Sequence, residues 1–427
     1  MLHRFKKHAC MASVLFTAVA PVAGQPQQPM QMNMPAESAS GWHLMQDAVV
    51  FGMFNHQGGP RGGDEFRVPN WWMGMFSRKV RSSQFTFNTM LSLDPATVGE
   101  KGYREIFQAG ESLDGRPLID HQHPHDFFMQ LAAVWRVPIG TGSGFTIAGG
   151  PAGEPAIGPV AFMHRASAAE NPIAPLSHHV FDSTHIAFGV VTAAVDHGPW
   201  LIEGSIFNGR EPDQHRWDFD FGALDSVATR VWFRPNERWE LQASTAHLKE
   251  PEALEHGDIQ RTTVSAGWMS KHESDFSAIT VAYGRNNREG DDQNSFLAEG
   301  NRHAGANSVF GRLEVHQAER VPLVTGFTAH DLGLSDSVIT VVALTLGGVR
   351  DVLNFRGFEG AVGTGVTFYR TPDALKATHG DHPISFQVFF RLRPPAGAMG
   401  RMWNMRMSQP MQPMSPMADP HAGHRMD

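Results

Sequence analysis

Histidine is abundant in this chain, and two groups of it have the residue types of a transition-metal site. The sequence contains 23 His among 427 residues, and the two densest groups lie in 120–126 and 177–185. Neutral imidazoles and carboxylates are natural ligands for Zn²⁺, Cu²⁺ or Ni²⁺, and H-x-H spacing brings two imidazoles together in an extended chain. The alternative is that these histidines bond to loop backbone or pack a constriction. The candidate ligands are His121, His123, His125, Asp126, His178, His179, Asp182 and His185.

Methionine concentrates near the two ends of the chain. The last 32 residues hold eight of the 21 Met, together with repeated Pro and Gln. Soft thioethers combined with imidazoles select Cu⁺ or Ag⁺. Repeated Pro excludes a regular helix, so we expect flexible tails, and compositional drift is the alternative explanation. The candidate soft ligands are Met30, Met32, Met34, Met399, Met402, Met405, Met407, Met411, Met414, Met417, His421 and His424.

The spacing of these tail methionines resembles Met-rich segments of periplasmic copper-handling proteins. Those segments carry M-x-M and M-x-x-M repeats, which appear here as Met405/Met407 and as Met411/Met414/Met417. The resemblance implies that the tails bind Cu⁺ and that periplasmic copper proteins are partners. No cofactor is required by this interpretation. Copper would be the bound metal, as Cu⁺ at the tails and as Cu²⁺ or Zn²⁺ at the loop histidines.

Composition excludes several classes of protein. The net charge of −8 gives no basic surface for nucleic acid, so no nucleic-acid partner is expected. A single Cys excludes a disulfide scaffold and a Cys-based zinc module. Only 18% of residues are charged, while Gly and Pro number 43 and 28, which argues against a helical bundle or coiled coil.

The beginning of the chain has the three parts of a secretory signal peptide. Arg4, Lys6 and Lys7 precede an apolar run from Ala9 to Ala23, and small residues then lead to cleavage before Gln25. The run is shorter than the roughly 20 residues that a spanning helix needs, which disfavours a membrane anchor. We therefore expect an exported protein whose only Cys is removed with its signal.

The middle of the chain alternates apolar and polar residues with a period of two, which predicts strands. In 84–93, for example, Phe85, Phe87 and Leu91 share one face, and Asn88 and Met90 share the other. Tight links and long links alternate between these segments. Short turns on one rim and long loops on the other are typical of transmembrane barrels. The predicted long links are 56–69, 94–126, 150–183, 209–225, 249–261 and 286–307.

Aromatic side chains strengthen the prediction of a membrane barrel. Trp200, Trp239 and Trp268 stand at strand ends on the apolar face, where a membrane interface favours amphipathic rings. With the final segment ISFQVFFRLRP, the pattern over about 42–393 resembles bacterial outer-membrane porin-like β-barrel proteins. The resemblance implies an all-β, antiparallel, up-and-down transmembrane barrel in the cell outer membrane, in contact with its lipid. The alternative is a large secreted β-sandwich or propeller.

We expect about 16 strands, with 14 as the second count because 323–349 is ambiguous. The predicted division is a signal peptide at 1–24, a flexible Met/Gln/Pro-rich segment at 25–41, the barrel at 42–395 and a disordered Met/His-rich tail at 396–427. Both tails would lie in the periplasm. The two histidine loops would lie on the opposite rim, where neighbouring hairpins bring the two groups together.

The predicted function is a porin-like channel associated with copper binding or copper tolerance, which passes small solutes or metal ions. Charged side chains on the polar strand face would line the pore and set its selectivity; they are Glu203, Arg230, Glu240, Arg312, Glu314 and Arg391. One alternative is a non-conducting metal-binding or structural barrel. A second alternative is a membrane-embedded hydrolase built on Ser183 and His185. Because neither a nucleophile elbow nor another catalytic motif occurs, we expect no enzyme.

Overall fold

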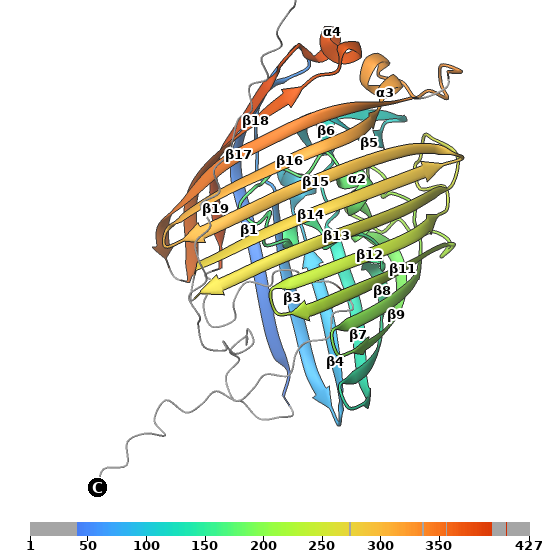
Figure 1. The fold of residues 1–427 in the computed structure, drawn as a ribbon, viewed down its shortest axis with the longest axis vertical. Helices are drawn as coiled ribbons and strands as arrows, with labels where there is room; N and C mark the ends of the chain where they lie inside the picture. Colours follow the sequence, from blue (N-terminus) through green and yellow to red (C-terminus); the bar gives the residue numbers. More distant parts are fainter. Residues whose placement is uncertain (1–40, 273–274, 335–336, 356, 395–406, 408–427) are drawn as a thin grey trace, which may run out of the picture. The chain divides into compact units, whose positions relative to one another are not determined.

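The computed structural model describes residues 41–272, 275–334, 337–355, 357–394 and Met407. The proposed signal peptide and, apart from Met407, the methionine tails lie outside the described residues. Antiparallel strands form a closed barrel (Figure 1), which confirms the predicted fold class. Among the described residues, no helix combines the length and the apolarity needed to cross a membrane.

Sixteen strand positions make up the barrel, because β2 and β3 occupy one position and both pair with β1. The barrel closes where β1 pairs with β19, from Val50 opposite Leu392 to His56 opposite Phe386. The strands are β1 (His43–Gln57), β2 (Gly63–Arg67), β3 (Asn70–Val80), β4 (Ser83–Leu91), β7 (Phe128–Gly140), β8 (Ser143–Gly153), β9 (Ala187–His197), β10 (Trp200–Phe207), β11 (Ser226–Asn236), β12 (Trp239–Leu248), β13 (Ile259–His272), β14 (Asp275–Arg288), β15 (Asp291–Ala304), β16 (Asn307–Glu319), β17 (Val338–Phe355), β18 (Phe358–Arg370) and β19 (Ile384–Arg393).

Alternation along each strand separates an outer apolar face from an inner polar face. In β12, Trp239, Leu241 and Ala243 are exposed on the outside, while Gln242 and Ser244 are buried on the inside. Side chains of successive residues point to opposite faces of a strand, so the period-two pattern gives the barrel wall an apolar outer face and a polar inner face. The inner face therefore supplies polar groups to whatever fills the lumen.

One predicted connection is wrong. The segment 286–307 is not a long link, because it contains β15, which is joined to β14 by a tight turn at Glu289–Gly290. Both turn residues have positive φ, 51° and 103°. The inner face of β15 carries Ser295, Glu299 and His303, all buried, and such polar residues resemble a loop in the sequence. The total of 16 strands is nevertheless confirmed.

Two long connections fold against the inner face of the barrel. The β4–β7 connection contains α1 (Asp94–Thr97) and a hairpin of β5 (Tyr103–Leu113) and β6 (Arg116–Gln122). The β8–β9 connection, residues 154–186, contains η1 (Phe162–His164), α2 (His178–Phe181) and η2 (Ser183–His185). We call residues 154–186 the plug. The remaining helices, α3 (Arg320–Thr325), η3 (Asp373–Leu375) and α4 (Lys376–His379), belong to other long connections of the same rim (Figure 1).

Hydrogen bonds to the inner faces of distant strands place the plug inside the barrel. Its backbone at Ala156 and Gly158 donates to hydroxyls of Ser205 on β10 and Ser244 on β12. Further along, the plug bonds to Glu299 on β15, Glu314 on β16 and Gln387 on β19. A single segment reaches all of these strands only by crossing the lumen.

Candidate functional site

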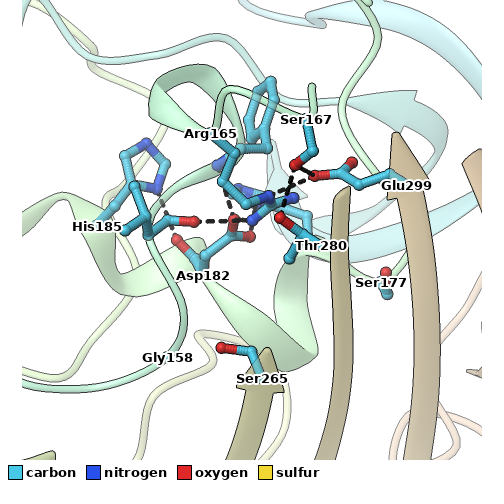
Figure 2. Close-up of polar contacts among 12 residues, drawn as sticks. Gly158, Arg165, Ser167, Ser177, Asp182, His185, Ser265, Thr280 and Glu299 are labelled. Carbon is cyan, nitrogen blue, oxygen red and sulfur yellow. Dashed lines mark hydrogen bonds and ion pairs between the residues drawn. The ribbon is translucent and has the colours of Figure 1, made fainter. Parts of the chain in front are cut away.

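Arg165 is the central anchor of the plug. Its guanidinium donates to Asp182 at 2.7 Å, to Glu299 at 2.6 Å and to the Val160 carbonyl at 2.8 Å (Figure 2). Ser167 donates a further hydrogen bond to Glu299 at 3.0 Å. Arg165, Asp182 and Glu299 are all buried. Removing one member of a buried ion pair costs about 3–5 kcal/mol, because the remaining charge loses its partner.

The inner-face residues that were predicted to line a pore mostly hold the plug. Arg230 forms ion pairs with Glu203 at 2.7 Å and with plug residue Glu154 at 2.8 Å. Arg312 donates to the Ile173 carbonyl at 2.8 Å, and Glu314 accepts a hydrogen bond from Ser177 at 2.7 Å.

Arg391 and Glu240 are the two remaining residues that were predicted to line a pore. Arg391 forms an ion pair with plug residue Glu170, and Arg393 reaches the same carboxylate at 3.1 Å. Glu240 instead pairs with Arg234 at 2.7 Å. These charged side chains lie on the inner face of the barrel. Their described partners are largely protein groups of the plug.

The two predicted histidine groups meet inside the barrel. The His123 and His178 rings have centroids 5.6 Å apart, the His178 and His185 rings 5.4 Å, and the His125 and His185 rings 5.7 Å. His123 and His125 come from the β4–β7 connection, whereas His178 and His185 come from the plug. We call these four residues the histidine cluster. They lie within the lumen, where the plug meets the β4–β7 connection, deeper than the outer rim on which they were expected.

Each Nδ1 atom of the histidine cluster is held by an oxygen. His178 Nδ1 lies 2.7 Å from Asp182, and His125 Nδ1 lies 2.8 Å from Asp94. His185 Nδ1 lies 2.7 Å from the Asp182 carbonyl. His123 Nδ1 lies 3.2 Å from the Pro124 carbonyl. A carbonyl only accepts, so in His123 and His185 the Nδ1 atom donates and Nε2 keeps its lone pair.

The four Nε2 atoms are the free ends of these rings. The Nε2 atoms of His123, His125, His178 and His185 are buried and have no hydrogen-bond partner in the described structure. Buried nitrogens are ordinarily satisfied, so four such atoms in one cluster need an explanation. Metal-binding histidines characteristically donate Nδ1–H to a carboxylate or carbonyl and present Nε2 to the ion. This arrangement matches that description.

Burial favours the neutral form of three members of the cluster, which is the form that binds a metal. Burial lowers the pKa of His178 to about 4, against the opposing effect of the Asp182 carboxylate. Burial also lowers the pKa of His123 and His185 well below the usual histidine value. These rings are therefore neutral at pH 7 and offer lone pairs to a cation. A cavity of about 70 Å³ lies beside His123 and His125.

The four rings contact one another in a chain, from His123 through His178 and His185 to His125, and their nitrogens do not converge on one point. A tetrahedral ion with metal–nitrogen bonds of 2.0–2.1 Å would place ring centroids about 5.2 Å apart. Among the described residues, three or more His or acidic ligand atoms lie mutually within 4.8 Å only at two acidic clusters, Asp213/Asp218/Asp220 and Glu252/Glu255/Glu319. Binding of one ion by all four residues would therefore require the cluster imidazoles to move toward a common centre.

The other predicted ligands lie near the cluster but have different partners. His179 Nδ1 lies 3.1 Å from Glu211, and His121 Nδ1 lies 3.0 Å from the Ile119 carbonyl. Asp126 accepts a hydrogen bond from Arg216 at 3.2 Å. Asp182 bonds to both Arg165 and His178, so it orients an imidazole and is already neutralised.

Sequence reasoning missed Asp94, which orients His125. Local ligand spacing does not reveal such a residue, since it lies 31 positions away from His125 in the chain. Its position directly after β4, at the start of α1, was the only local signal. The proposed hydrolase pair is not assembled: the Ser183 hydroxyl accepts from Arg261 at 3.3 Å, and His185 Nδ1 is used by the Asp182 carbonyl.

The chain has the fold of solved bacterial outer-membrane porins. OprB of Pseudomonas putida aligns with a TM-score of 0.52 and 9% identity, over 83% of this chain and 94% of that chain. The outer membrane channel DcaP of Acinetobacter baumannii aligns at 0.49 and 10% identity, over 82% and 97%. An anion-selective porin from Comamonas acidovorans aligns at 0.47 and 11% identity, over 83% and 100%. No protein-family model and no curated protein matches the chain.

Proposed function

We propose that this protein is an outer-membrane barrel that binds a transition-metal ion, copper or zinc, inside a filled lumen. The observation that carries the proposal is the histidine cluster, in which four buried Nε2 atoms lack partners while every Nδ1 is held by an oxygen. The porin-like fold and the predicted signal peptide support an outer-membrane location. Thus metal binding, one of the predicted functions, has the strongest support.

The plug favours binding over general passage of solutes. It is tied by buried ion pairs and hydrogen bonds to inner-face residues of β10, β11, β15, β16 and β19. A solute path through the lumen would require several of these buried pairs to break together, and each broken pair costs several kcal/mol. The barrel in its described state is therefore better suited to hold a bound ion than to pass small molecules.

The chemistry of the donors limits the choice of metal. Four imidazoles without a thiolate suit Zn²⁺, Cu²⁺ or Ni²⁺. Among divalent first-row ions, Cu²⁺ binds nitrogen sites most tightly, which favours copper wherever copper is available. Asp94 and Asp182, which hold Nδ1 atoms of the cluster, would orient the ligands and raise their basicity.

Titration of the purified full-length chain with Zn²⁺ in detergent tests the proposal. We expect one tight equivalent that is lost in the double variant His178→Ala/His185→Ala. His197→Ala is the matched control, because His197 lies at the β9–β10 turn and bonds to Ser143, away from the plug. Equal stoichiometry and affinity in the double variant and the control would contradict the proposal.

The second candidate is a porin-like channel that passes small solutes. Its support is the barrel fold, which aligns with OprB at a TM-score of 0.52. Conductance of the pure protein in a planar bilayer separates the two candidates. A plugged metal-binding barrel gives rare, brief openings, whereas a general porin gives a steady conductance.

A further inference from the structure

Methionine side chains gather on the inner wall of the barrel, where a polar face is the rule. Met45 on β1, Met73 and Met75 on β3, Met90 on β4 and Met129 on β7 are each 5% exposed or less. Pairing between strands sets Met45 directly opposite Met75 and Met73 directly opposite Met90. Met129 stands where the pairing of β4 with β7 shifts register. The five residues thus form one continuous patch.

The composition of this patch differs from that of an ordinary packed core. Five of its eight buried apolar members are Met, and the others are Ala152, Ile186 and Phe188. Cores are normally filled with Leu, Ile, Val and Phe, which have better defined rotamers, and Met serves as an occasional gap filler. Neither Leu nor Val occurs among these eight residues. This choice of side chain indicates that the thioether sulfur itself is useful there.

A small pocket separates the methionine patch from the plug. It is lined by Met73, Met75, Met90 and Met129 on the wall side and by His164 and His185 on the plug side. Met407, which was predicted as a tail ligand, also lines this pocket and is 2% exposed. The pocket has a volume of about 20 Å³. A volume of roughly 10–15 Å³ is enough for one water-sized particle, so the pocket has room for a single ion.

Imidazole nitrogen is available to this pocket. The Nε2 atom of His185 is buried and has no hydrogen-bond partner in the described structure. His164 is 8% exposed, and its ring packs edge-on against Trp71 with centroids 5.2 Å apart. Met163, the residue before it on η1, packs against the methionine patch. The plug therefore brings nitrogen and further sulfur to a wall that already supplies thioethers.

We propose that this methionine pocket is a second metal site, which binds a soft monovalent cation, Cu⁺. Uncharged thioethers are soft ligands that Cu⁺ prefers and that bind harder divalent ions poorly, and imidazole also suits copper. The pocket shares His185 with the histidine cluster but is otherwise built from different residues. His185 has one free nitrogen, Nε2, because its Nδ1 is held by the Asp182 carbonyl, so it can bind an ion in only one of the two sites at a time. The methionine pocket does not depend on metal binding by the other three histidines.

Titration of the anaerobic full-length protein in detergent with Ag⁺, a redox-stable probe for Cu⁺, tests the proposal. We expect the double variant Met73→Leu/Met90→Leu to bind one equivalent fewer than the wild type, and to keep its Zn²⁺ binding. A Met-to-Leu exchange conserves volume and preserves the packing. Met53→Leu is the matched control, since Met53 is a fully buried methionine of β1 in a different apolar cluster. The wild-type stoichiometry in the double variant would overturn the proposal.

A second measurement leaves the methionine pocket unsubstituted. With ¹³C-methyl-labelled methionine, Ag⁺ should shift the resonances of Met73, Met75 and Met90 and leave Met53 unchanged. His123→Ala/His178→Ala should retain these shifts while losing the Zn²⁺ equivalent, which distinguishes failure of this site from failure of the histidine cluster. Unshifted Met73 and Met90 resonances at saturating Ag⁺ would show that the patch is only a packed core.

Discussion

Replacing Arg165 with Met should release the plug from the barrel wall. In the wild type the Arg165 guanidinium lies 2.6 Å from Glu299 and 2.7 Å from Asp182. In the plugged state of the variant, both carboxylates lose this buried partner. Breaking a buried pair in this way costs about 3–5 kcal/mol. When the plug moves aside, water reaches the two carboxylates and the penalty disappears. The ratio of open to plugged molecules should therefore rise by roughly 10²- to 10⁴-fold.

Two partial compensations place the expected change near the lower end of that range. Arg312 still contacts Glu299 at 3.1 Å, and His178 still contacts Asp182 at 2.7 Å. The assay is single-channel recording in a planar bilayer, with the fraction of time spent open as the readout. A shift in gel migration on heating shows that the barrel itself remains folded.

Arg285→Met is the control for this experiment. Arg285 pairs with Asp292 at 2.6 Å, but both side chains are 40% exposed or more, and exposed pairs contribute about 0–1 kcal/mol. Its open fraction should change less than about fivefold. If Arg165→Met remained as closed as Arg285→Met, the ion pairs would not hold the plug. A wild type that conducts steadily would refute the filled lumen altogether.

Three further predictions follow from individual contacts. Asp94→Asn should weaken Zn²⁺ binding by about 10- to 100-fold, because the carboxylate that holds His125 Nδ1 at 2.8 Å is lost; isothermal titration measures it. Gly284→Val should raise the open fraction in bilayers, because a Cβ there would stand 2.8 Å from the Phe181 ring of α2. Arg230→Met should lower the free energy of unfolding by about 3–5 kcal/mol in denaturant titrations, and an unchanged midpoint would contradict its role as a buried anchor.

The barrel could be predicted from the sequence because each strand has one lipid-facing side. Trp239, Leu241 and Ala243 alternate with polar residues in the first half of β12, and the same pattern recurs along the chain. The pattern failed at β15, where Ser295, Glu299 and His303 serve the plug and its neighbours. An inner strand face that binds a polar segment has the same residue types as a loop. Alternation alone therefore does not distinguish such a strand from a loop.

The histidine cluster could be predicted only in part. Spacing in 120–126 and 177–185 identified the residues, and barrel topology indicated that the two connections are neighbours. Which nitrogens are held and which are free depends on Asp94, Asp182 and backbone carbonyls, and these contacts arise only from the tertiary fold. The cluster lies deep in the lumen because the plug carries His178 and His185 there. No local sequence pattern predicts the path of the plug across the lumen.

The methionine pocket was hidden because its members come from separate strands. Met90 appears on the polar face of its strand, which was a local signal, but its partner Met73 is identified only by the β3–β4 register. The sequence drew attention to the dense methionines of the tails instead. Of those tail residues the structure describes Met407, and that residue lines the same pocket.

Anomalous diffraction at the zinc edge, from crystals of the full chain soaked with Zn²⁺, tests the central claim most directly. The account predicts one strong peak among the Nε2 atoms of His123, His125, His178 and His185, with these rings rotated toward it. A peak confined to the exposed acidic cluster of Asp213, Asp218 and Asp220, with none among the four histidines, would contradict it.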